Sequence, residues 1–122
     1  MKSKTILVIE DSELNMKLVR SLLKIGNYAM VEARDAETGM KLIQQNKPDL
    51  ILMDIQLPGI DGLAATRMIK SDQQLKDIPV VAFTSYAMEG DEGLAHKAGC
   101  AGYIIKPIDT HTFLKQLEHY LR

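Results

Sequence analysis

The sequence contains no tryptophan, few other aromatic residues and a single cysteine. Because Cys100 is the only cysteine, no internal disulfide can form, and its place in the small-residue segment 98–101 indicates packing instead of catalysis. His96, His111 and His119 have no second ligand at metal-binding spacing, so we assign them no function. These scarcities argue against a disulfide framework and against a histidine- or cysteine-based metal site.

A charge excess and a long apolar run are also missing. Lys and Arg number 15 against 16 Asp and Glu, which gives a formal net charge of −1, so nucleic acid is not an expected partner. The longest apolar runs are far shorter than the ~20 residues of a spanning helix, and residues 1–4 lead into a predicted strand instead of a signal-peptide segment. We therefore expect no membrane insertion and a cytoplasmic location.

What the sequence does contain is an alternation of short apolar runs with helical periodicity. A length of 122 residues with 46% hydrophobic and 25% charged residues is typical of one soluble domain, which we place at residues 1–122. Branched apolar runs, typical of buried parallel strands, lie at 5–9, 28–33, 50–53, 78–83 and 103–105.

Helical spacing of apolar residues follows each of these runs. The first predicted helix places Leu14, Leu18 and Leu22 on its buried face, with Val19 and Leu23 widening the apolar stripe. The buried positions of the later helices are Ala36, Met40 and Ile43 after a cap at Asp35, Ala65 and Ile69 after a cap at Asp61, Leu94 and Ala98 within about 87–98, and Phe113, Leu114, Leu117 and Leu121 after Asp109. Five βα units predict an α/β fold with an open, five-stranded, doubly wound parallel sheet, whose strand order stays open.

Polar residues follow four of the predicted strands at the point where each strand ends. They are Glu10 and Asp11, Asp54, Thr84, and Lys106. Carboxyl ends of parallel strands meet at one edge of a sheet, so these side chains are expected in one crevice. Three acids repel one another, and Mg²⁺ relieves such repulsion through hard oxygen ligands. A carboxylate can attack phosphorus, and a lysine and a hydroxyl can stabilise the transferring phosphoryl group.

Each of these residues also has an ordinary structural explanation. Asp11 or Ser12 can cap the following helix, a lysine after a strand is often only a surface residue, and Thr84 suits a strand without any function. An aspartate that ends a buried strand is an uncommon place for a solvated charge, so Asp54 favours a functional interpretation. The ordered set as a whole predicts a site.

The motifs at the strand ends resemble the receiver domains of two-component response regulators. They are Glu10-Asp11, the segment from Leu52 through Asp54 to Gly62, Thr84-Ser85 and Lys106-Pro107. The resemblance covers essentially the whole chain and is strongest to free-standing, single-domain members. It implies a five-stranded flavodoxin-like fold and a phosphoacceptor signalling protein instead of an enzyme with a separate substrate.

The resemblance also implies a role for each residue at the sheet edge. Asp54 is the phosphoacceptor, and it binds Mg²⁺ (or Mn²⁺) with Asp11 and the backbone carbonyl of Gln56, while Glu10 acts through a bound water. Thr84, Ser85 and Lys106 hold the phosphoryl oxygens, and Lys106-Pro107 forms a cis peptide.

A second set of implied roles concerns switching and timing. Thr84 and Tyr103 form the switch that remodels the face of helix four, strand five and helix five, although Tyr103 also suits a core or amphipathic surface position. Gln56 and Tyr86 tune the lifetime of the acyl phosphate, and we hypothesise that Tyr86 shields it. The implied partners are a sensor histidine kinase or a histidine phosphotransferase, which would dock at the first helix, and a downstream protein at the switching face.

Three alternatives stay open on the sequence alone. The chain can be a receiver excised from a larger protein, although the start at Met1 favours a free-standing one. A phosphatase with an aspartyl nucleophile would need a second acid placed as general acid and usually a cap over the substrate, and the loop from Ile55 to Asp61 offers neither an obvious cap nor the length for one. A flavodoxin-like FMN carrier would bring its phosphate against three acids, and no aromatic-rich loop is present to hold the flavin ring.

Overall fold

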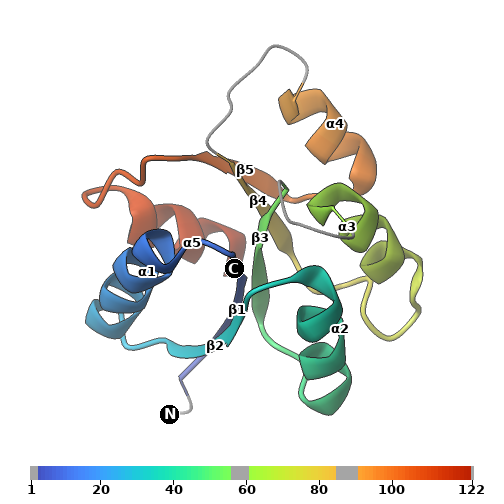
Figure 1. The fold of residues 1–122 in the computed structure, drawn as a ribbon, viewed down its shortest axis with the longest axis horizontal. Coiled ribbons are helices and arrows are strands. Elements are labelled where there is room, and N and C mark those ends of the chain that lie inside the picture. The colour runs from blue at the N-terminus through green and yellow to red at the C-terminus, as the bar shows by residue number, and fades with distance from the viewer. Residues whose placement is uncertain (1–2, 56–60, 85–90, 122) are drawn as a thin grey trace.

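The computed structural model describes residues 3–55, 61–84 and 91–121. Strands and helices alternate strictly within these ranges, as Figure 1 shows, so the predicted βα order is confirmed. The elements are β1 (Thr5–Ile9), α1 (Glu13–Ile25), β2 (Ala29–Ala33), α2 (Ala36–Gln45), β3 (Leu50–Asp54), α3 (Gly62–Ser71), β4 (Val80–Thr84), α4 (Asp91–Ala98), β5 (Gly102–Ile105) and α5 (Phe113–Leu121).

The five strands form one parallel sheet in the order β2-β1-β3-β4-β5. In the register of the sheet, Ile6 on β1 is paired with Met30 on one side and Leu50 on the other. The chain moves outward from β1 to β2 and then returns across β1 to β3, so the direction of winding reverses between β1 and β3. Such a reversal leaves a crevice beyond the carboxyl ends of these two strands, which is where ligands bind in open α/β sheets.

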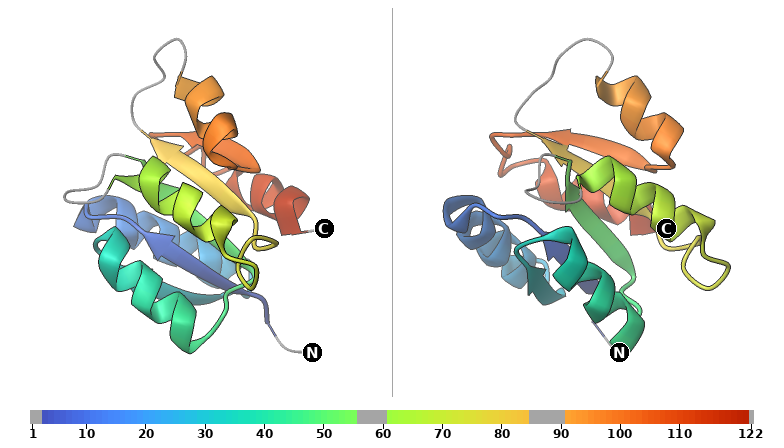
Figure 2. Two further views of the ribbon diagram at one scale, coloured as in Figure 1. Left: turned by 90° about the vertical axis from the view of Figure 1, so that its right-hand side faces the viewer. Right: turned by 45° about the vertical axis from the view of Figure 1, so that its right-hand side comes forward.

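Helices cover both faces of the sheet, with α1 and α5 on one face and α2, α3 and α4 on the other (Figures 1 and 2). Alternate strand residues point to opposite faces, so Ile6 and Val8 pack toward α1 and α5 while Leu7 and Ile9 pack in the other layer. Burial on both faces explains why the central strands β1, β3 and β4 are almost continuously apolar in sequence. The core therefore fixes each strand end firmly at the crevice.

The caps of three helices agree with local sequence rules. The side chains of Ser12, Asp35 and Asp61 accept hydrogen bonds from backbone amides at the starts of α1, α2 and α3, respectively. The capping role that the sequence left open between Asp11 and Ser12 thus belongs to Ser12. None of the helices within residues 3–55, 61–84 and 91–121 combines the length and apolar character that a membrane span requires.

Two leucines that were predicted to be buried, Leu14 and Leu94, are exposed, while the other predicted core positions of their helices are buried or partly buried. Leu14 is 78% exposed, because the buried stripe of α1 runs through Met16, Val19, Leu22 and Leu23 and leaves Leu14 on the other side of the helix. In α4, Leu94 is half exposed.

The last two helices differ from the prediction in their details: small residues fill the buried side of α4, and a turn precedes α5. Ala95 and Ala98 are the buried positions of α4. The last helix begins at Phe113 and not at Asp109, whose carbonyl and carboxylate accept hydrogen bonds from the amides of Phe113 and His111 in the turn before it. These differences affect surfaces, and they leave the sheet order and the crevice unchanged.

Candidate functional site

The predicted acidic residues meet at the crevice between β1 and β3. One carboxylate oxygen from each of Glu10, Asp11 and Asp54 lies within 4.8 Å of the others. Glu10 is fully buried and Asp54 is 3% exposed, whereas Asp11 is exposed at the mouth of the crevice. The sequence prediction that these acids converge is therefore confirmed.

Lys106 brings a positive charge into the same cluster from the end of β5. Its ammonium donates to Oε1 and Oε2 of Glu10 at 2.9 and 2.8 Å and to Oδ2 of Asp54 at 3.1 Å. The lysine side chain is only 9% exposed, and Nζ lies 4.6 Å from the ring centroid of Phe83, a distance at which a cation is attracted to an aromatic face. Lys106 thus bridges the carboxylates of β1 and β3.

The acid–base equilibrium of Glu10 is strongly perturbed, because its pKa is raised. Burial raises the pKa of its carboxyl to about 7, and the adjacent Asp54 carboxyl acts in the same direction. Hydrogen bonds from Lys106 and Asn15 oppose this rise because they stabilise the ionised form. Proton uptake at this position is therefore tied to the charge state of the whole cluster.

Asn15 is a contact that sequence reasoning missed. It lies on the first turn of α1, and its side-chain Nδ2 donates to Oε1 of Glu10 at 2.9 Å. The available signal is its place within the Glu13-Leu14-Asn15 segment directly after the acidic pair, but spacing alone does not show which way the amide points.

The start of α3 approaches the backbone of Asp54 very closely. A Cβ atom added at Gly62 would lie 2.2 Å from the Asp54 carbonyl oxygen and 2.6 Å from the Ile55 Cα. Only a residue without a side chain fits here, because such distances are far below van der Waals contact. Gly62 therefore sets the position of α3 against the end of β3.

Some of the remaining predicted site residues lie within the described residues, and others lie outside them. Thr84 is buried at the end of β4, where its carbonyl accepts a hydrogen bond from the Lys106 amide at 2.7 Å, and Tyr103 is partly buried on β5. The Lys106–Pro107 peptide bond is cis, as the resemblance implied. Gln56, Ser85 and Tyr86 lie outside the described residues.

The donor set of the cluster suits a hard divalent cation. Three carboxylates face one ammonium group among the described residues, so the site carries excess negative charge. Mg²⁺ prefers oxygen ligands, and in proteins it usually binds one or two carboxylates and keeps several waters. A carboxylate cluster at a partly open position provides the oxygens and leaves room for the waters. The residues present therefore fit such an ion.

The fold is an open parallel sheet, and the acidic cluster bridged by Lys106 lies where the direction of winding reverses. These two features define a class of α/β proteins that bind their ligands at the carboxyl edge of the sheet. Within this class, residues 6–118 match the response regulator receiver domain family, and the chain belongs to that family. The polar-differentiation response regulator DivK of Brucella anthropi is 43% identical over 118 residues, which are 97% of this chain and 96% of that protein.

Two similar solved structures come from the same family of domains. One is the receiver domain of the sensor histidine kinase PA1611 from Pseudomonas aeruginosa PAO1, with 28% identity, a TM-score of 0.90 and coverage of 98% of both chains; it has a magnesium ion coordinated in its active-site cleft. The other is the Mn²⁺-bound form of the response regulator Rcp1, with 30% identity and a TM-score of 0.82 over 95% of this chain and 90% of that one. The predicted family and fold are confirmed, and the family favours a receiver over a phosphatase or an FMN carrier.

Proposed function

We propose that residues 1–122 act as one receiver domain that accepts a phosphoryl group on Asp54 from a phosphohistidine donor. The observation that carries this proposal is the buried Asp54 carboxylate, 3.1 Å from the Lys106 ammonium and within 4.8 Å of two further acids. A signalling role follows, in which the chain promotes only its own phosphorylation and dephosphorylation. Because donors of this kind are phosphorylated inside the cell, the proposal includes a cytoplasmic location.

The same proposal includes a Mg²⁺ site, which Mn²⁺ can also fill. Asp11, Asp54 and the carbonyl of Gln56 would hold the ion directly, and Glu10 would hold one of its waters. When bound, the ion supplies positive charge that offsets the charge of the phosphoryl oxygens. Support comes from the acidic donor set of this chain and from the metal-bound receiver structures described above.

Each residue around Asp54 has its own role in the phosphoryl transfer. A carboxylate oxygen of Asp54 attacks phosphorus, the new O–P bond forms as the N–P bond breaks, and the imidazole of the donor leaves with the electron pair of that bond. Lys106 turns from the carboxylates toward the phosphoryl oxygens, and Thr84 and the Ser85 amide complete their coordination. Before the reaction, the hydrogen bonds from Lys106 keep Asp54 and Glu10 in place.

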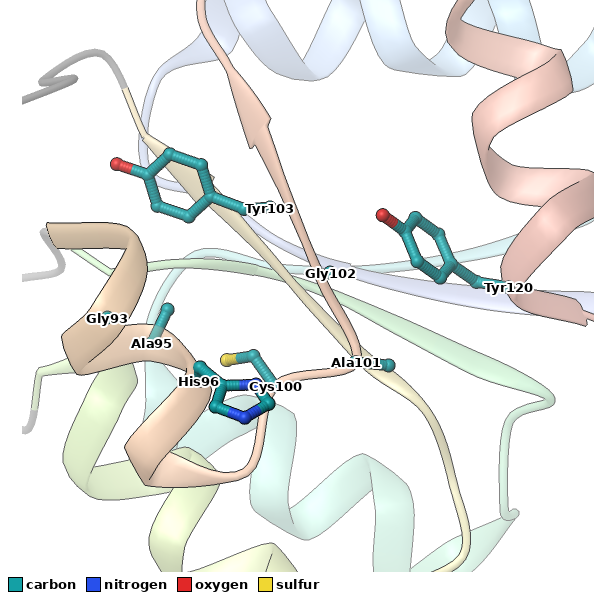
Figure 3. A pocket seen from close by; sticks show the side chains of 8 residues that line it. All are labelled: Gly93, Ala95, His96, Cys100, Ala101, Gly102, Tyr103 and Tyr120. Atoms are coloured by element: carbon teal, nitrogen blue, oxygen red, sulfur yellow. The ribbon is translucent and has the colours of Figure 1, made fainter.

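We propose that the downstream protein binds at the face formed by α4, β5 and α5. A hollow of about 670 Å³ lies there, and Figure 3 shows Tyr103 of β5 and Tyr120 of α5 on either side of Gly102. The floor and the α4 wall include small residues, among them Ala95 and Ala101, so a partner can approach the backbone. If phosphorylation draws Thr84 inward, Tyr103 follows on the neighbouring strand, and coupling of about 1–3 kcal/mol is enough to change partner affinity.

We propose that the protein that donates the phosphoryl group docks beside α1. Leu14 is 78% exposed on the first turn of this helix, and Ile105 is 48% exposed at the end of β5 just before Lys106. Two exposed apolar side chains on elements that lead into the acidic cluster suit the apolar surface of a helical partner. A sensor histidine kinase or a histidine phosphotransferase is the partner that the family implies.

Intact-mass analysis tests the phosphoacceptor proposal. Wild type and Asp54→Asn are incubated with acetyl phosphate, with Mg²⁺ and with excess chelator. One added phosphoryl group is expected in wild type with Mg²⁺ only. An adduct on Asp54→Asn of the same yield, or one that survives chelation unchanged, contradicts the proposal; if wild type gives no adduct, the same comparison is made with a phosphorylated histidine phosphotransferase as donor.

A further inference from the structure

The Glu10 carboxylate is held by side chains from two different parts of the fold. Among the side chains that the structure describes, the N–H donors are Lys106, which follows β5, and Asn15, which lies on α1; the adjacent Asp54 carboxyl is also hydrogen-bonded to Glu10. Lys106 and Asn15 both donate to Oε1 at 2.9 Å, and Lys106 also reaches Oε2 at 2.8 Å. Glu10 is fully buried, and the loss of a donor to a buried charged group is costly.

The hydrogen-bonding capacity of Lys106 is already used in full. An ammonium group has three protons, and the structure places them on two oxygens of Glu10 and one of Asp54. In the proposed function Lys106 must also donate to a phosphoryl oxygen. It can do so only by releasing at least one carboxylate oxygen, and two of the three oxygens that it holds belong to Glu10. When a Glu10 oxygen is released, the other donors to Glu10 carry more of its support.

We propose that Asn15 is a positioning residue that keeps Glu10 in place when Lys106 turns to the phosphoryl group. This inference rests on the proposed function, because it assumes that Lys106 moves between the two sets of oxygens. The amide of Asn15 carries no charge, so it orients Glu10 without cancelling the negative charge that attracts Mg²⁺. Its own place is set by α1, whose first turn is capped where Ser12 accepts from the Asn15 backbone amide.

A purely structural role of Asn15 makes a different prediction. If the side chain only helped α1 to begin, its loss would weaken Mg²⁺ binding by the same factor whether or not Lys106 is present. If it shares the support of Glu10 with Lys106, its loss matters more when Lys106 is absent. A double-mutant cycle separates the two possibilities.

The experiment is a Mg²⁺ titration, followed by NMR chemical shifts, of wild type, Asn15→Leu, Lys106→Met and the double variant. We expect Asn15→Leu to weaken Mg²⁺ binding by about twofold when Lys106 is present. In the Lys106→Met background we expect about tenfold weakening, because the Asn15 amide is then the remaining side-chain N–H donor to the Glu10 carboxylate among the described residues. Asn15→Gln keeps an amide donor and is expected to recover most of the affinity in both backgrounds.

Matched variants control for folding. Asp35→Ala removes the cap of α2, a helix that contributes no residue to the acidic cluster, so it should lower thermal stability and leave Mg²⁺ affinity unchanged. If Asn15→Leu does not fold, Asn15→Ala removes the donor with a smaller side chain and takes its place in the cycle.

Equal weakening in the two backgrounds, or none in either, overturns the role of Asn15. The titration needs no phosphoryl donor, so a wild type that binds Mg²⁺ but is not phosphorylated leaves this result interpretable. A wild type that binds no Mg²⁺ overturns the metal site of the proposed function and this inference with it.

Discussion

Replacing Gly62 with alanine tests how closely α3 must approach the phosphoacceptor strand. The added Cβ would lie 2.2 Å from the Asp54 carbonyl oxygen, against a practical limit of 3.0 Å, so the two segments must separate by at least 3.0 − 2.2 = 0.8 Å. Helix propensity alone predicts the opposite outcome, because alanine stabilises a helix by about 1 kcal/mol relative to glycine. The clash should outweigh this gain, since the atoms that the Cβ would meet belong to the backbone of Asp54 and Ile55 and cannot rotate away.

We expect Gly62→Ala to lower the free energy of unfolding by about 1–3 kcal/mol, the usual cost of overpacking. The same shift should displace Asp54 and slow its phosphorylation by acetyl phosphate by roughly tenfold, because a displacement of about 1 Å at a reacting group can cost up to a hundredfold.

Gly93→Ala is the matched control for this prediction. Gly93 lies in α4, and a Cβ there has no atom within 4 Å, so this variant should be neutral or gain up to about 1 kcal/mol of stability. Urea unfolding followed by far-UV circular dichroism and the initial rate of phosphorylation are measured for both variants. A Gly62→Ala protein that matches Gly93→Ala in both measurements would refute the reasoning.

Three further predictions concern protonation, docking and lifetime. Folding raises the pKa of Glu10 from 4.5 to about 7, so this group stabilises the metal-free fold most below pH 4.5 and loses that contribution as the pH rises through 7; urea unfolding across pH 4–8 should show this trend in wild type and not in Glu10→Gln. Leu14→Glu should slow phosphotransfer from a histidine phosphotransferase by about tenfold, yet leave the rate with acetyl phosphate within about twofold, because Leu14 is exposed outside the acidic cluster. Tyr86→Ala should shorten the lifetime of the acyl phosphate, measured by the decay of the intact-mass adduct; an unchanged decay rate counts against shielding by Tyr86.

The convergence of the site could be predicted from the sequence because it follows from topology. Asp54 and Lys106 each end a strand, and the carboxyl ends of parallel strands necessarily meet at one edge. The caps at Asp35 and Asp61 were equally accessible, since they depend on only three or four neighbouring residues. Local rules and sheet geometry therefore carry most of the fold and most of the acidic cluster.

The features that the sequence did not reveal depend on contacts between distant segments. Asn15 reaches Glu10 only because of the angle at which α1 leaves β1, and Gly62 matters only because α3 returns to the backbone of Asp54. Leu14 was wrongly predicted to be buried because leucines at every fourth position drift around a helix of 3.6 residues per turn. The predicted Val19, Leu22 and Leu23 are buried, and Met16 joins them in place of Leu14. The roles of Gln56, Ser85 and Tyr86 remain predictions.

The identity of the phosphoacceptor is the central claim, and chemical trapping tests it most directly. Borohydride reduces an aspartyl phosphate to homoserine, so peptide mass spectrometry after phosphorylation and reduction marks the residue that carried the phosphoryl group. We expect homoserine at position 54 alone, formed with Mg²⁺ and absent after chelation. Homoserine at position 11, or phosphate on a histidine, serine or threonine with Asp54 unmodified, would contradict it.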